Sequence, residues 1–138
     1  DNFYDEGIPG DASSYRFKDT FEDVFTADSL MNMPYFAVLG NHDYYGNWSA
    51  EIAYTELSER WEMPNNYYTQ SVRYNGSDGT PFTVQFVAID TVALAGITHG
   101  EDPTEQPPGP MDAEAAQSQM AWIEQELSTS TAEILFVK

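Results

Sequence analysis

The chain has 138 residues, of which 41% are hydrophobic and 14% aromatic, so its composition is that of one globular domain with a real core. Five Lys and Arg residues against 23 Asp and Glu residues give a formal net charge of -18, which repels phosphate backbones and anionic membranes and excludes nucleic acid as an expected partner. The sequence has no apolar run long enough to span a bilayer and no cysteine for a disulfide framework.

The first part of the chain predicts a loop followed by a helix. Residues 5–14 are rich in Gly, Pro, Ser and Asp, which is typical of a loop. From Phe17 to Phe25 the apolar side chains recur at helical spacing, with Lys and acidic residues on the opposite face. We therefore expect an amphipathic helix that packs its aromatic face on a sheet. Taken alone, Asp1 and Tyr4 belong to an ordinary frayed terminus.

A short apolar run at residues 35–39 stops at Gly40, which predicts a β-strand followed by a loop. The carboxyl end of such a strand is where α/β sheets commonly place chemistry. Asn41 offers an amide oxygen to a metal ion, His42 titrates near neutrality, and Asp43 can fix the tautomer of the imidazole. Gly, Asn and Asp are also common turn residues, so the spacing alone favours an ordinary turn as much as a functional site.

Residues 49–60 are expected to form a helix directly after this loop. Ser49 is a candidate N-cap, and Ala53, Leu57 and Trp61 follow at steps of four residues, which predicts an apolar stripe. A helix that begins here directs the positive end of its dipole toward a nearby bound anion.

The middle of the chain predicts a hairpin and a long loop. Residues 67–74 and 81–90 are β-rich runs that flank a turn-forming cluster of Asn, Gly, Ser and Asp. Asp90 ends the second run. Its carboxylate could contribute to a site, but we expect it to cap the following turn. Residues 97–110 contain four prolines and two glycines, which predict an irregular loop near the site or a flap. His99 lies in that loop and is expected to be solvated rather than to bind metal.

The last part of the chain predicts one helix and one strand. Apolar residues recur at steps of three and four from Ala113 to Leu127, so an amphipathic helix with a polar back is expected. Met120 and Trp122 are packing residues in this interpretation. Residues 134–137 are an apolar run that predicts a buried strand.

The residues Gly40-Asn41-His42-Asp43 resemble the GNH(D/E) motif of the calcineurin-like metallophosphoesterases. A wider resemblance, to the purple acid phosphatases of the small tartrate-resistant type, covers residues 1–4 (the tail of a GDxxY motif), 17–29, 40–61 and 89–96. It implies an α/β fold in which residues 1–138 form a single domain, part of a four-layer αββα sandwich that is incomplete at both ends.

This resemblance implies a dinuclear metal centre of Fe(III) and a divalent ion, which is Fe, Zn or Mn. It makes Asp1 the carboxylate that bridges the ions, Tyr4 a phenolate ligand of the ferric ion and Asn41 a ligand of the divalent ion. These roles suit the donors, because a phenolate prefers hard Fe(III) to Zn(II) and a carboxylate can hold two cations close together. Such a site needs more ligands than these, so we expect the isolated chain to bind no metal pair and to be inactive.

For the parent protein the resemblance implies an acid phosphatase that hydrolyses phosphate monoesters with a hydroxide bound to the two metals. His42 would contact the phosphate and protonate the leaving group, helped by Asp43. Tyr44 stands where relatives often carry a second His, which bears on acid catalysis and substrate preference. The expected substrates are small phosphate monoesters or a phosphoprotein. A phosphodiesterase of the same superfamily and a non-catalytic interaction or structural module are the alternatives.

Two N-x-S/T sequons begin at Asn47 and Asn75, both at expected surface turns. The first coincides with a sequon position of the resembled family. We therefore expect a secreted or extracellular glycoprotein, with a vacuolar or lysosomal location as the alternative.

Overall fold

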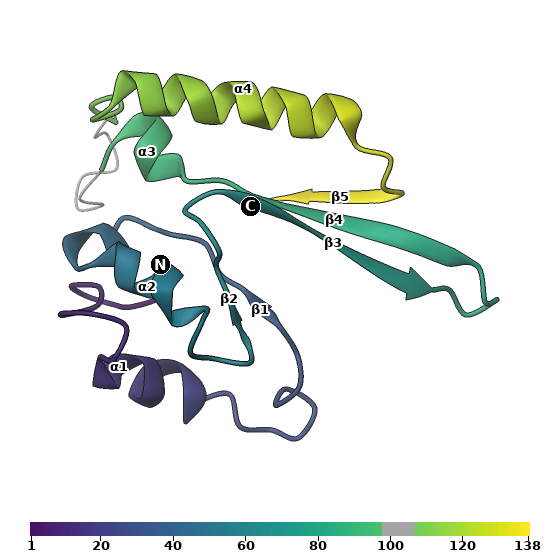
Figure 1. Cartoon of the computed structure of the whole chain (residues 1–138), viewed down its shortest axis with the longest axis horizontal. Helices are drawn as coiled ribbons and strands as arrows, with labels where there is room; N and C mark the ends of the chain where they lie inside the picture. Colours follow the sequence, from purple (N-terminus) through teal and green to yellow (C-terminus); the bar gives the residue numbers. More distant parts are fainter. Residues whose placement is uncertain (98–106) are drawn as a thin grey trace.

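The computed structural model describes residues 1–97 and 107–138. Figure 1 shows two sheets in separate layers, with α1 and α2 beside one and α3 and α4 beside the other. The helices and strands are, in chain order, α1 (Tyr15–Phe17), the π-helix η1 (Lys18–Glu22), β1 (Tyr35–Phe36), the 3₁₀-helix η2 (Asp43–Tyr45), α2 (Trp48–Tyr54), β2 (Trp61–Glu62), β3 (Tyr68–Asn75), β4 (Pro81–Ala88), α3 (Thr91–Ala95), α4 (Ala113–Thr129) and β5 (Ile134–Val137). Of the described helices, none is long and apolar enough to cross a membrane.

Both sheets are small. β1 pairs in parallel with β2, and the second sheet has the order β3-β4-β5, with β3 antiparallel and β5 parallel to β4. This mixture of helices with parallel and antiparallel strands confirms the predicted α/β class. The predicted loop over residues 97–110, with His99, lies for the most part outside the described residues.

The predicted hairpin is confirmed. β3 and β4 pair antiparallel over their whole length. At the turn between them the N–H of Gly76 donates to the carbonyl of Thr80 at 2.8 Å. Gly79 adopts a φ of 81°, in the left-handed region where a side chain would be strained, so the glycine-rich cluster determines this turn.

A cluster of aromatic rings forms the centre of the first layer. The ring of Phe17 stacks on Tyr54 with 3.9 Å between centroids, and Phe21 meets Trp61 edge-on at 5.2 Å. Phe3 closes the cluster, with its ring 5.1 Å from that of Phe17. Phe3, Phe17, Phe21 and Trp61 are at most 4% exposed. The N-terminal segment is therefore packed into the core rather than frayed.

The predicted helix over residues 17–25 is shorter than expected, because η1 ends at Glu22. Phe17 and Phe21 are buried as predicted, whereas Phe25 is 38% exposed. Arg60 pairs with the Glu22 carboxylate and donates to the carbonyl of Phe25 at 2.6 Å. The Arg60 guanidinium thus holds the chain after the helix in a turn. The spacing of apolar residues could not predict this contact, because Arg60 is distant from residues 22–25 in the sequence.

The helix predicted at residues 49–60 is also displaced. α2 begins at Trp48 and ends at Tyr54, and its N-cap is Asn47 rather than Ser49. The expected apolar stripe is wrong for Ala53, which is exposed, and for Leu57, which is 65% exposed, while Trp61 is buried but belongs to β2. The buried face of α2 instead consists of Ala50 and Glu51, and it is turned toward the N-terminal segment.

α4 and β5 have the predicted type but not the predicted burial. α4 buries Ala116 and Gln119, while Met120 and Leu127 are 54% and 46% exposed. β5 pairs with β4 and, within the described residues, with no other strand. Ile134, Phe136 and Val137 are 42%, 55% and 49% exposed, and Leu135 is partly buried. The prediction of a buried strand is therefore wrong for this chain, because β5 is an edge strand here.

Replacing Phe17 with Ala in the full-length protein tests the aromatic cluster. We expect a loss of about 3–5 kcal/mol in the free energy of unfolding, because a buried ring is removed and a cavity remains. Tyr15→Ala, two residues earlier and 68% exposed, is the matched control and should change stability by less than about 0.5 kcal/mol. Denaturant titration of both variants gives the two values, and equal losses would contradict the packing described.

Candidate functional site

The candidate site lies where the chain leaves β1. The ladder continues past the strand, since the N–H of Ala37 donates to the carbonyl of Glu62 at 3.1 Å, and Leu39 is buried. Gly40 then opens the loop that η2 follows, starting at Asp43. The predicted strand over residues 35–39 is shorter than expected, because β1 ends at Phe36, but the loop follows it as predicted.

The carboxylate of Asp43 fixes the N-terminal segment to this loop. It is fully buried and accepts backbone N–H bonds from Asn2 at 2.9 Å, Phe3 at 2.9 Å and Gly40 at 2.8 Å. These N–H donors satisfy the oxygens of a carboxylate that is out of contact with solvent. As a result, segments about forty positions apart in the sequence lie side by side.

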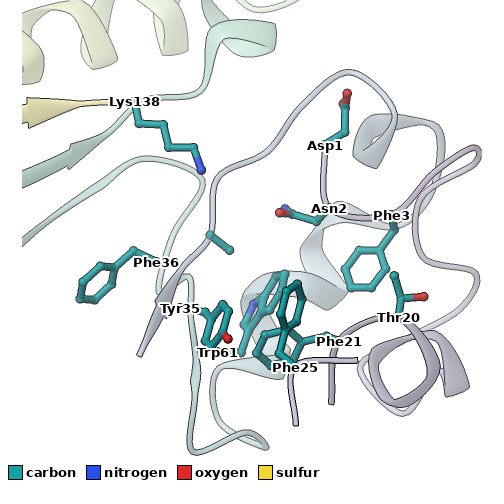
Figure 2. Close-up of a pocket in the computed structure, with 11 residues that line it drawn as sticks. Asp1, Asn2, Phe3, Thr20, Phe21, Phe25, Tyr35, Phe36, Trp61 and Lys138 are labelled. Atoms are coloured by element: carbon teal, nitrogen blue, oxygen red, sulfur yellow. The ribbon is translucent and has the colours of Figure 1, made fainter. Parts of the chain in front are cut away.

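Asp1 and Tyr4 are brought to the loop in this way. The O–H of Tyr4 donates to one carboxylate oxygen of Asp1, and the backbone N–H of His42 donates to the other at 3.1 Å. A Cβ at Gly40 would lie 2.5 Å from the backbone nitrogen of Asp1, so glycine allows this close approach of the two segments. Figure 2 shows this carboxylate directed away from the aromatic cluster, into which Phe3 points.

The imidazole of His42 lies against Tyr4, with 4.4 Å between ring centroids. Its Nδ1 is 2.6 Å from the carbonyl oxygen of Asp5. A carbonyl only accepts, so Nδ1 carries the proton and Nε2 is left for other partners. The expectation that Asp43 fixes this tautomer is wrong, because the described Asp43 bonds go to Asn2, Phe3 and Gly40 and the backbone of Asp5 fills that role.

A hollow of about 270 Å³ brings Asp1 and Asn41 together with Gly40 and one side of α3; we call it the Asp1–Asn41 hollow. Carboxylate, amide and phenol oxygens are suitable donors for a hard cation, and the bond between Asp1 and Tyr4 shows that two of them meet at one point. Among the described residues, however, no three His, Cys, Asp or Glu side chains are grouped closely enough to hold an ion. The donors present therefore fit part of a metal site.

Glu51 is a buried acid that the sequence analysis treated only as a favourable charge in the first helical turn. It is fully buried, one carboxyl oxygen accepts from the Asn2 side chain at 2.9 Å, and the other has no hydrogen-bond partner in the described part of the chain. Burial, with the charge of Asp43 adding to it, raises the pKa of Glu51 to about 8. Glu51 is thus a neutral acid at acidic pH, and no signal in the sequence indicated this.

Asp90 caps the next helix, as predicted. Its carboxylate accepts from the N–H of Ala93 at 2.9 Å at the start of α3, and it also accepts from the Asn66 amide at 2.9 Å and the Tyr44 hydroxyl at 2.5 Å. Burial and this bond raise the pKa of Tyr44 well above its usual range, so the phenol keeps its proton. Tyr44 is consequently a structural donor here.

The sequence profile described as calcineurin-like phosphoesterase matches residues 1–136 of the chain. The chain belongs to the calcineurin-like phosphoesterase family. Curated relatives in this family include the tartrate-resistant acid phosphatase type 5 of Mus musculus, at 39% identity, and that of Homo sapiens, at 36%, both over 137 residues. Purple acid phosphatase 7 of Arabidopsis thaliana is 33% identical over 90 residues, or 62% of the chain.

The alignments to the mouse and human phosphatases include 99% of this chain, but they span only 40% and 41% of the length of those two proteins. Among solved structures, GAP50, titled the anchor in the inner membrane complex of Plasmodium, matches with a TM-score of 0.71 at 22% identity, over 96% of this chain and 40% of that one. This likeness supports the phosphoesterase fold. The whole protein's activity is taken up below as a proposal.

The family motif therefore brings Asp1, Tyr4, Asn41 and His42 to one loop cluster, whereas Asp43 serves as its internal clamp. The sequon residues lie elsewhere. Asn47 is exposed and its amide donates to the carbonyl of Gly10 at 2.6 Å, and Asn75 is exposed at the end of β3. Their glycosylation stays a prediction.

The pKa of Glu51 predicts a pH-dependent stability. A folded-state pKa of about 8, above the usual 4.5, gives stability that is fully present below pH 4.5 and is lost as pH rises through 8. Glu51→Gln keeps the shape without the charge, so in the full-length protein it should gain stability relative to wild type over that range. Thermal midpoints across the range test this. Glu56→Gln, at an exposed site, is the control, and parallel curves for wild type and Glu51→Gln would contradict the assignment.

Proposed function

We propose that the full-length protein containing this chain is an acid phosphatase that hydrolyses phosphate monoesters at a dinuclear metal site. The observation that supports it is the convergence of Asp1, Tyr4, Asn41 and His42 on one loop cluster in a chain whose relatives are acid phosphatases. The substrate is a small phosphate monoester or a phosphoprotein.

In this proposal Tyr4 would hold Fe(III) through its phenolate, Asp1 would bind both ions through its carboxylate, and Asn41 would give its amide oxygen to a divalent Fe, Zn or Mn. The remaining ligands come from parts of the protein outside this chain. When bound, the ions supply positive charge for the phosphate oxygens and make a water molecule more acidic. That charge matters here because a chain with a net charge of -18 otherwise repels an anionic substrate.

His42 is the proton donor in the proposed reaction. Because Nδ1 is bound to the carbonyl of Asp5, the proton that reaches the leaving group is held at Nε2. Tyr4 packs against the ring and the main chain of His42 is bonded to Asp1, so the imidazole is oriented before substrate arrives. Asp43 acts through the loop as a positioning residue.

We further propose that the protein is secreted or extracellular, or else vacuolar or lysosomal. Support comes from the exposed sequon residues Asn47 and Asn75. Mass spectrometry of the natural protein before and after glycosidase treatment tests the glycosylation, and unmodified asparagines at both positions would remove this support.

Asn41→Ala and His42→Ala should differ in the full-length, metal-loaded protein. Loss of Asn41 removes a ligand, so both metal content and turnover should fall. Loss of His42 should lower kcat by roughly 10²–10⁴-fold with metal content nearly intact, and by less for nitrophenyl phosphate than for an alkyl phosphate. Metal analysis and steady-state kinetics give both readouts.

Equal losses on both substrates, or metal loss from His42→Ala, would assign His42 to a ligand or structural role. A metal-loaded parent that cleaves diesters but not monoesters would favour a phosphodiesterase. One that cleaves neither would favour an interaction or structural module.

Tyr4→Phe tests the ferric ligand by colour. If Tyr4 donates a phenolate to Fe(III), the wild-type protein is purple and the variant loses that visible absorption band, while Tyr15→Phe, at an exposed site, keeps it. Absorption spectra and iron analysis measure this. An active, fully metallated wild-type protein that is colourless and contains only Zn(II) would contradict the iron assignment and leave the phosphatase proposal intact.

A further inference from the structure

Arg16 in α1 is a cation to which neither the sequence pattern nor the proposed reaction assigns a role. It is one of only five Lys and Arg residues in the chain. Its side chain is half-buried, and Nη1 donates to the carbonyl of Gly7 at 2.7 Å while Nη2 donates to the carbonyl of Tyr4. One guanidinium therefore binds two main-chain acceptors in the N-terminal segment.

The two carbonyls belong to one turn. The N–H of Gly7 donates to the carbonyl of Phe3 at 3.0 Å and closes a turn over residues 3–7. Gly7 has a φ of 66°, and a Cβ there would lie 2.7 Å from the backbone nitrogen of Gly46, so the turn lies directly against the end of η2. Arg16 thus ties both ends of this turn to α1.

The turn carries groups that the proposed reaction uses. Tyr4 is the proposed ferric ligand, and the carbonyl of Asp5 accepts from Nδ1 of His42 at 2.6 Å. The imidazole also packs on the Tyr4 ring, with 4.4 Å between centroids. A movement of the turn would therefore displace Tyr4 and release Nδ1 of His42 together.

Arg16 is itself anchored in the core. The next residue, Phe17, is buried in the aromatic cluster, and the N–H of Arg16 donates to the hydroxyl of Ser14, the N-cap of α1, at 3.4 Å. The guanidinium lies over the ring of Phe3, 5.7 Å from its centroid, where a cation and an aromatic face attract each other. The turn is thus held from a fixed support.

An arginine close to a phosphatase site could instead bind the phosphate of the substrate. In this structure both terminal nitrogens of Arg16 face main-chain carbonyls, and two acceptors bound by one planar group fix its orientation. These contacts favour a role in holding the turn over a role in binding an anion.

We propose that Arg16 is a positioning residue, which holds Tyr4 and His42 in their mutual arrangement by fixing the turn over residues 3–7. The guanidinium suits this role because its donors form a planar fork, whereas the ammonium of a lysine is a single point charge. This inference rests on the proposed function and adds a residue to it.

Arg16→Met and Arg16→Lys test the inference in the full-length protein. Met keeps an apolar stem beside Phe3 without donors, and Lys keeps the charge without the fork that reaches both carbonyls. Arg73→Met, at an exposed position of β3, is the matched control. Denaturant titration identifies which variants are folded before the readouts are compared.

The first readout is the tautomer of the neutral His42 ring, measured by nitrogen NMR on the protein loaded with diamagnetic Zn(II). We expect the proton on Nδ1 in wild type and in Arg73→Met, and a shift toward Nε2 in the Arg16 variants. The second readout is the rate at which a chelator removes the metal ions. We expect the Arg16 variants to lose metal roughly 10–100-fold faster, because groups that orient a ligand contribute about that much to metal binding.

The outcomes separate this inference from the phosphatase proposal. A proton on Nε2 in wild type, or folded Arg16 variants with the wild-type tautomer and rate of metal loss, would overturn the positioning role, and ester hydrolysis by wild type would still support the phosphatase. A change in only one readout would overturn the inference that Arg16 positions both residues. Changes in both readouts in a protein that hydrolyses no ester would support the positioning role and overturn the phosphatase.

Discussion

The buried carboxylate of Asp43 is the constraint on which the rest of the site depends. It accepts backbone N–H bonds from Asn2 and Phe3 on one side and from Gly40 on the other. These bonds align the N-terminal segment with the motif loop, so that Asp1 reaches the backbone of His42. They also fix the start of the aromatic cluster, because Phe3 follows directly. One carboxylate thus joins the core to the candidate site.

Burying a carboxyl group is costly, and this chain with a net charge of -18 buries Asp43, Asp90 and Glu51. The three side chains differ in their hydrogen-bond partners. The Asp43 carboxylate accepts from the backbone N–H groups of Phe3 and Gly40. Asp90 is held by a helix N-terminus and by two side-chain donors. Burial and then the nearby charge of Asp43 raise the pKa of Glu51, whose one donor in the described part of the chain is the Asn2 side chain.

The Asp90 network also relates the two layers. Through Tyr44 it ties η2 of the first layer to the end of β4 in the second, and Gln119 of α4 completes it by accepting from the Asp90 N–H at 2.8 Å and donating to the Asp90 carbonyl at 3.2 Å. Because these contacts are buried, α3 and α4 are fixed relative to the motif loop. The Asp1–Asn41 hollow lies along this junction, which is where ligand sites commonly form.

The sequence by itself determined the local features. The glycine-rich cluster between two β-rich runs gave the hairpin, the motif at residues 40–43 located the site, and the position of Asp90 after a strand predicted a cap, because each depends on neighbouring residues. Tertiary structure alone decided the partners of Asp43, the neutral state of Glu51 and which face of α4 is buried. The spacing of apolar residues identifies one face of a helix, but it does not show what packs against that face. The environment of a carboxylate depends on hydrogen-bond donors that come from distant parts of the chain.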